Sequence, residues 1–84
     1  MENMNPDYIS SPGATLTEVL ADRGMTQADL ARRTGYSEWM INEIIKGKAV
    51  ITPGTAIQFE RALGVPASFW NQRERNYRKW LNHK

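Results

Sequence analysis

The chain has 84 residues, of which 40% are hydrophobic and 24% are charged, and its formal net charge is +2. This length predicts one small domain, and a sequence without cysteine excludes a disulfide framework and a thiolate metal site. No apolar run approaches the roughly 20 residues that cross a bilayer, and the N-terminus lacks the pattern of a signal peptide, so we expect a cytoplasmic protein. The single histidine, His83, is expected to be solvated.

Glycine and proline divide the chain into a short arm and five helical segments. Residues 1–12 are polar and contain two prolines, so they are expected to form an N-terminal arm that precedes a domain over residues 13–84. The first helix is expected from Gly13 to Gly24, because its leucine and valine residues fall on one helical stripe.

The second helix is expected over residues 27–34. Thr26 precedes it in a position typical of an N-cap, and Asp29 follows three residues later, as in a capping box. Gly35 is expected to end this helix, because glycine tolerates the positive φ that often closes one. These signals predict a short helix with a defined start and end.

The third helix is expected to begin after Ser37 and to stop at Gly47. At about 100° per residue, its side chains separate into two faces. The apolar face is expected to join the core and comprises Met40, Ile41, Ile44 and Ile45. The other face is polar apart from one tryptophan and comprises Glu38, Trp39, Asn42, Glu43 and Lys46.

Two further helices are expected to complete the chain. Thr52 is placed to cap the fourth helix, with Pro53 at its first position and Gly64 at its end. Pro66 opens the fifth and longest helix, which is expected to reach about Asn82. No segment alternates apolar and polar residues with a period of two, so the predicted fold class is all-α.

The spacing around Gly35 is typical of a helix-turn-helix. Counted from Gln27, Ala31 is the fifth residue and Gly35 is the ninth. The fifth residue of this motif must be small, because the second helix crosses close above it, and the ninth favours glycine. The apolar residues Ile41 and Ile44, at places 15 and 18, are expected to bury the second helix of the motif. The alternative is a helical corner in an unrelated bundle.

The segments MTQADLARRTGYS and INEIIKGK together resemble the lambda-repressor-like (XRE) helix-turn-helix domain. The segments PGATLTEVLADRGMTQADLA and IIKGKAVITPGTAIQFERALGVPASFW are similar to its HigA-type antitoxin branch, and the resemblance covers residues 11–82. It implies a five-helix DNA-binding domain, usually a homodimer, that binds double-stranded DNA and represses its own operon. Where a cognate toxin protein exists, such a protein also neutralises it.

Some members of this branch continue into a domain that resembles a zinc peptidase. The sequence does not contain the metal-binding histidines of that domain, so no hydrolase activity is expected from it. The chain is expected to be either a complete small antitoxin or the N-terminal domain of a longer regulator.

The resemblance also implies which residues face DNA. The family commonly places a glutamine against a phosphate at the start of the second helix, and it reads base edges from the third. The implied DNA-binding set is Gln27, Arg32, Arg33, Ser37, Glu38, Trp39, Asn42, Glu43, Lys46 and Lys48. At the base-reading places the family usually has Gln, Arg, Ser, Thr or Lys, whereas this chain has two carboxylates and an indole. Phosphate repels a carboxylate, unless that carboxylate accepts a hydrogen bond from cytosine N4.

The last helix combines basic charge with large apolar side chains. Residues 66–84 hold five Lys or Arg against one Glu, whereas residues 1–65 hold six against eight Asp or Glu. The basic charges are either a solvated face or a surface for phosphate or an acidic partner. Phe69 and Trp70 are expected to pack at least partly on the domain. The predicted dimer or partner interface comprises Trp70, Tyr77, Trp80 and Leu81, unless the helix folds back and buries these residues itself.

Two functions remain open from the sequence. One is a sequence-specific repressor that also serves as an antitoxin, and the other is a protein-interaction module that keeps the fold but binds DNA weakly. The glutamine, arginines and lysines of the implied DNA-binding set favour the first, and the two glutamates favour the second. No enzyme activity, cofactor or metal is expected, because no nucleophile and base pair or phosphate-binding glycine loop is present in the sequence.

Overall fold

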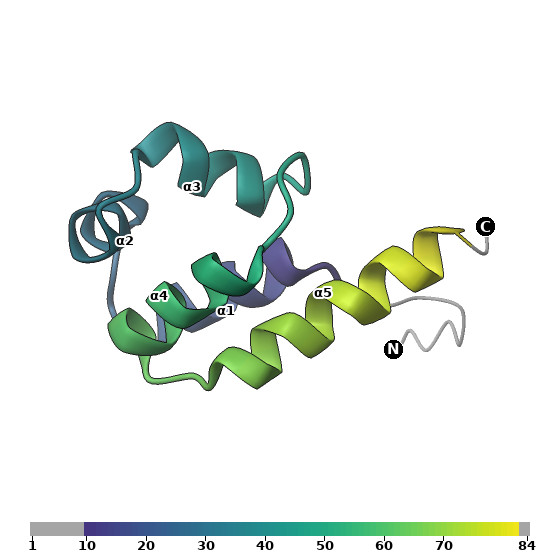
Figure 1. The fold of residues 1–84 in the computed structure, drawn as a ribbon. Helices are drawn as coiled ribbons and strands as arrows, with labels where there is room; N and C mark the ends of the chain where they lie inside the picture. Colours follow the sequence, from purple (N-terminus) through teal and green to yellow (C-terminus); the bar gives the residue numbers. More distant parts are fainter. Residues whose placement is uncertain (1–9, 83–84) are drawn as a thin grey trace.

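The computed structural model describes residues 10–82, and the helices within that range form an all-α fold (Figure 1). They are α1 (Pro12–Asp22), α2 (Gln27–Thr34), α3 (Glu38–Ile45), α4 (Pro53–Leu63) and α5 (Ala67–Asn82). The predicted five-helix fold without strands is thereby confirmed for this part of the chain. Residues 1–9 of the predicted arm and His83 lie outside the described residues, and Pro12, which we assigned to the arm, is the first residue of α1.

The predicted helix ends are confirmed because each is set by local hydrogen bonds. Thr26 and Asp29 form the expected capping box at the start of α2, where the Thr26 Oγ1 accepts from the Asp29 backbone N–H at 3.0 Å. Gly35 closes α2 with a φ of 80°. At α1 the cap is one that the sequence analysis did not identify, since Ser11 Oγ accepts from the Ala14 backbone N–H at 3.1 Å.

The core lies between α1, α3, α4 and α5, with α2 packed across α3 and α4. Ile41 and Ile44 of α3 are buried, while Met40 and Ile45 pack against the cluster and keep some exposure, so the predicted apolar face of α3 is confirmed. The buried hydrophobic residues are Leu16, Leu20, Leu30, Ala31, Ile41, Ile44, Ile51, Ala56, Phe59, Leu63 and Trp70.

Trp70 anchors α5 to this core. Its side chain has an exposed fraction of 0%, and its ring meets Phe59 edge to face with the ring centroids 5.4 Å apart. A fully buried side chain cannot touch a second molecule, so Trp70 has to be removed from the predicted dimer or partner interface. Phe69, which was expected to pack on the domain, remains 39% exposed.

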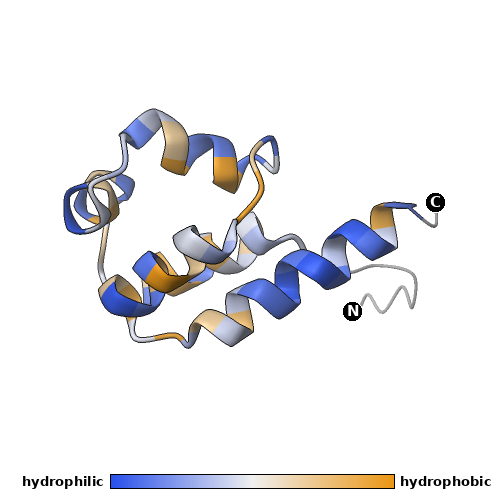
Figure 2. Cartoon of the chain, viewed as in Figure 1, coloured by the Kyte–Doolittle hydropathy of each residue, from blue (hydrophilic) through white to orange (hydrophobic). Residues whose placement is uncertain are grey.

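Polar contacts fix α5 further along its length. Arg73 donates from Nε and a terminal nitrogen to the Thr15 Oγ1 of α1, at 3.2 and 2.7 Å. Glu74 accepts from the backbone N–H of Ile51, in the loop before α4, at 3.1 Å. Beyond these contacts α5 is mostly hydrophilic (Figure 2), and its end lies on the side of the molecule away from α2 (Figure 1).

Gly13 lets the backbone of α1 touch the end of α3. A Cβ added at Gly13 would lie 2.5 Å from the carbonyl oxygen of Ile44 and 2.7 Å from the carbonyl carbon of Ile45. The obstacles are backbone atoms, which cannot rotate away as a flexible side chain would. Glycine is therefore required here by space and not by backbone conformation, since its φ is not in the left-handed region.

We expect Gly13→Ala to destabilise the fold by about 1–3 kcal/mol, because α1 and α3 must move apart to accommodate the methyl group. Urea unfolding followed by far-UV circular dichroism measures the change in the free energy of unfolding. Gly54→Ala is the matched control, because that glycine also lies in the first turn of a helix and its added Cβ would meet only Thr52 Oγ1 at 3.9 Å. Equal stability of the two variants would contradict the close contact at Gly13.

Candidate nucleic-acid interface

α2 and α3 form a tight corner around Gly35. Ala31, on the inner side of α2, is only 7% exposed, as expected for the small residue over which the second helix crosses. The Thr34 hydroxyl donates to the Leu30 carbonyl at 2.8 Å, and Tyr36 packs against the core beside the turn. The corner holds α3 with its apolar face inward and leaves its opposite face in contact with solvent.

The outward face of α3 presents an indole between two carboxylates. Trp39 is 72% exposed and is the most exposed large hydrophobic side chain among the described residues. Glu38 and Lys46 are exposed, whereas Asn42 and Glu43 are half-buried. The face is therefore bulky and rich in hydrogen-bond acceptors, and Lys46 contributes its positive charge at the C-terminal end of the helix.

Two side chains stand at the N-terminal ends of the motif helices. Ser37 caps α3, where its Oγ accepts from the Met40 backbone N–H at 3.1 Å, so its hydroxyl proton is left to donate elsewhere. Gln27 is the first residue of α2, and its Oε1 accepts from the Asn42 Nδ2 of α3 at 3.3 Å. Helix N-termini favour anionic ligands such as phosphate, because their backbone N–H groups and dipoles point outward.

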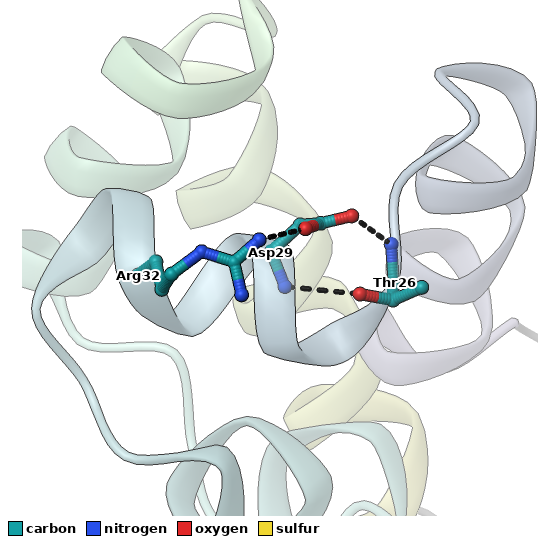
Figure 3. Close-up of polar contacts among 3 residues, drawn as sticks. All are labelled: Thr26, Asp29 and Arg32. Atoms are coloured by element: carbon teal, nitrogen blue, oxygen red, sulfur yellow. Dashed lines mark hydrogen bonds and ion pairs between the residues drawn. The ribbon is translucent and has the colours of Figure 1, made fainter.

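Asp29 links the capping box to the arginines of α2 (Figure 3). Its carboxylate accepts from the Thr26 backbone N–H at 2.9 Å and forms an ion pair with Arg32. The hydrogen bonds from Thr26 are the main cause that lowers the pKa of Asp29 below its usual value, and the charge of Arg32 adds to the effect. Arg32 would have to exchange this carboxylate for a phosphate, whereas Arg33 next to it is exposed.

The remaining predicted residues, Lys46 and Lys48, lie in the turn that follows α3. The Lys46 backbone N–H donates to the Asn42 carbonyl and that of Lys48 to the Glu43 carbonyl, each at 2.9 Å, and Gly47 between them has a φ of 80°. Both lysines are exposed. The structure thus brings the ten predicted residues together on α2, α3 and the turn after α3, on the opposite side of the molecule from the end of α5 (Figure 1).

Residues 16–70, more than half of the chain, match the model of the helix-turn-helix family. The chain belongs to this family. The Pseudomonas aeruginosa antitoxin HigA, solved with the higBA promoter, superposes with a TM-score of 0.84 at 26% identity, over 90% of this chain and 84% of that one. Another Pseudomonas aeruginosa protein, solved in complex with its operator DNA, superposes with a TM-score of 0.83 at 26% identity, over 89% of this chain and 82% of that one.

A curated relative extends the comparison beyond the antitoxins. The chain is 38% identical over 55 residues, which are 66% of its length, to Multiprotein-bridging factor 1 of Eremothecium gossypii. Those residues span only 36% of that protein. The predicted resemblance to XRE-type helix-turn-helix domains and HigA-type antitoxins is confirmed by the family match and by these solved structures. Across residues 10–82, no helix of this family member is both long enough and apolar enough to span a membrane.

The lowered pKa of Asp29 predicts a pH-dependent contribution to stability. A carboxylate with a depressed pKa in the folded chain stabilises the fold above its unfolded pKa of about 3.9, and this contribution is lost as the pH falls through the folded value. Asp29→Asn should therefore be less stable than the parent at neutral pH, and the difference should shrink steadily below about pH 4. Urea unfolding at a series of pH values measures it.

Arg32→Gln serves as the control for this experiment. It removes the ion pair and keeps the capping box, so most of the pH dependence should remain, since Thr26 is the main cause of the lowered pKa. A stability difference between Asp29→Asn and the parent that is the same at pH 7 and pH 3 would contradict the predicted linkage.

Proposed function

We propose that the protein is a sequence-specific DNA-binding transcriptional regulator, the antitoxin of a type II toxin-antitoxin pair, which represses its own operon as a homodimer. The observation that carries the proposal is the exposed, polar face of α3 in a chain that superposes along most of its length on an antitoxin bound to a promoter and on a protein bound to its operator. We assign it no catalytic role and no cofactor.

In this proposal α3 enters the major groove and its flanks hold the phosphates. Gln27 and Ser37, at the starts of α2 and α3, donate to phosphate oxygens on one side of the groove. Lys46 and Lys48 bind the backbone on the other side, and Arg32 and Arg33 reach flanking phosphates. Base edges are left to the side chains in the middle of the interface, namely Glu38, Trp39, Asn42 and Glu43.

The two glutamates give this interface selectivity at the expense of general attraction. A carboxylate that meets cytosine N4 gains a hydrogen bond, whereas other base edges offer it little or repel it. Binding to random DNA is driven by phosphate attraction, which Glu38 and Glu43 oppose. The indole of Trp39 offers an apolar surface of the kind that contacts a thymine methyl group.

The homodimer in this proposal is built on the end of α5. Tyr77 and Trp80 stack with their ring centroids 5.9 Å apart, and both keep part of their surface exposed, as does Leu81. These residues follow the core anchor Trp70 by two to three helical turns and stand apart from the DNA-facing corner (Figure 1). Pairing two chains there leaves both α3 helices free to reach half-sites about 34 Å apart.

A second candidate function is a protein-interaction module that retains the helix-turn-helix fold, either a toxin-neutralising protein or the N-terminal domain of a longer regulator. The observation that favours it is the 72% exposure of Trp39 between acidic neighbours, because tryptophan is enriched among the energetic centres of protein interfaces. Under this alternative the outward face of α3 binds a protein partner, such as the toxin, and DNA binding is weak.

The two candidates differ in a binding titration with the DNA upstream of the gene and a scrambled duplex of equal length at fixed salt. If α3 reads bases, replacing both Glu38 and Glu43 with Gln should raise affinity for the scrambled duplex and narrow the gap between the two. The reason is that the change removes repulsion from phosphate and loses acceptors for cytosine. As a control, replacing Lys46 and Lys48 with Gln should weaken binding to both duplexes alike. Equal affinity of the folded parent for both duplexes would favour the interaction module.

The proposed dimer predicts that Tyr77→Ala combined with Trp80→Ala shifts the chain toward monomer in sedimentation equilibrium. The physical reason is the loss of the apolar surface that pairing would bury. Phe69→Ala is the matched control, because it removes an exposed aromatic ring near the start of the same helix and should leave the dimer intact. A parent chain that stays monomeric at high concentration would rule out this interface.

A further inference from the structure

A side-chain hydrogen bond joins the two helices of the motif. The Nδ2 of Asn42, in the middle of α3, donates to the Oε1 of Gln27, the first residue of α2, at 3.3 Å. Both side chains are half-buried, so the pair lies at the inner edge of the exposed face and still reaches solvent. Its orientation is set by two helices whose packing is fixed by buried residues, including Leu30 and Ile41.

The direction of this hydrogen bond determines what each amide still offers. Asn42 uses one N–H, which leaves its second N–H as a donor and its Oδ1 as an acceptor. Gln27 uses its oxygen, which leaves both N–H groups of Nε2 as donors. Asn42 therefore presents a donor beside an acceptor, whereas Gln27 presents donors alone.

These two patterns match two different parts of a DNA duplex. The major-groove edge of adenine offers the N6 amino group as a donor and N7 as an acceptor, and asparagine pairs with both at once. Guanine offers two acceptors on that edge, and cytosine offers a donor at N4 without the adjoining acceptor. A phosphate offers acceptors alone, which suits the free Nε2 of Gln27 at the N-terminus of α2.

We infer that Asn42 is a specificity-determining residue that reads an adenine in the major groove, and that Gln27 is the positioning residue that orients it while donating to a phosphate. The inference rests on the proposed DNA-binding function. Contact with the phosphate would hold Gln27 in place, and Gln27 in turn would hold the Asn42 amide in the orientation that fits adenine. The opposite orientation would leave Asn42 two donors and would favour guanine.

The test begins with selection of binding sites by the full chain from a randomised duplex library. The parent should enrich a motif with one adenine in each half-site, Asn42→Ala should enrich the motif without preference at that position, and Gln27→Ala should weaken that preference. Asn76→Ala is the matched control, because Asn76 also bonds a glutamine side chain, Gln72, on the exposed face of α5. It should select the same motif as the parent.

A base analogue then tests the contact in the unaltered protein. Replacing the selected adenine with 7-deazaadenine removes N7 and leaves N6 and base pairing in place. The parent should lose about 5- to 150-fold in affinity, the range of one good bidentate base contact. The penalty should vanish in Asn42→Ala and shrink in Gln27→Ala, in samples whose circular dichroism matches the parent. A general loss of fold would lower affinity for both duplexes and leave their ratio unchanged.

The outcomes separate this inference from the proposed function. A parent motif whose adenine persists in Asn42→Ala, or whose affinity ignores 7-deazaadenine, would overturn the reading of adenine while DNA binding stands. A motif that depends on Asn42 but contains guanine at that position would overturn the assigned orientation. No enriched motif at all would overturn the proposed DNA-binding function, and the inference with it.

Discussion

The placement of α3 depends on a contact between two backbones. At Gly13 the first turn of α1 lies against the last carbonyl groups of α3, at a distance that excludes even a methyl group. At the other end of α3 the small side chain of Ala31 permits the crossing of α2. A helix of only 8 residues gains little stability of its own. These two close contacts therefore set the angle at which its outer face meets any ligand.

The rest of the core supports this arrangement through α5. Trp70 fills the space beneath α4 against Phe59, and Arg73 ties α5 to Thr15, two residues after Gly13. Arg23 adds a further link, because its Nε donates to the carbonyl oxygen of Leu63 at the end of α4 at 2.9 Å. The polar contacts join segments that are distant in sequence, so they stabilise the relative placement of the helices more than the helices themselves.

The sequence was sufficient for the helices and their ends because those depend on neighbours. Thr26 and Asp29 lie three residues apart, and Gly35 and Gly64 end helices through their own conformation. The requirement for Gly13 could not be predicted, since the obstacle is backbone at Ile44 and Ile45, more than 30 residues away. Burial of Trp70 was foreseen only in part, because helical periodicity places it on one stripe with Tyr77 without showing where the core ends.

The candidate site shows the same division. The resemblance to the family supplied the set of residues on α3, and the family match and the solved structures support it. What the sequence did not contain was the bond between Asn42 and Gln27, because it depends on how two helices cross.

The hydrogen bond between Glu74 and the Ile51 backbone N–H has a consequence for dynamics. This amide lies in the loop before α4 and is held by a carboxylate of α5, outside any helical hydrogen-bond ladder. Its exchange with deuterium therefore depends on the docking of α5 and is independent of fraying within a helix. A single amide resonance thus reports whether the last helix is seated on the domain, separately from the integrity of α2 and α3.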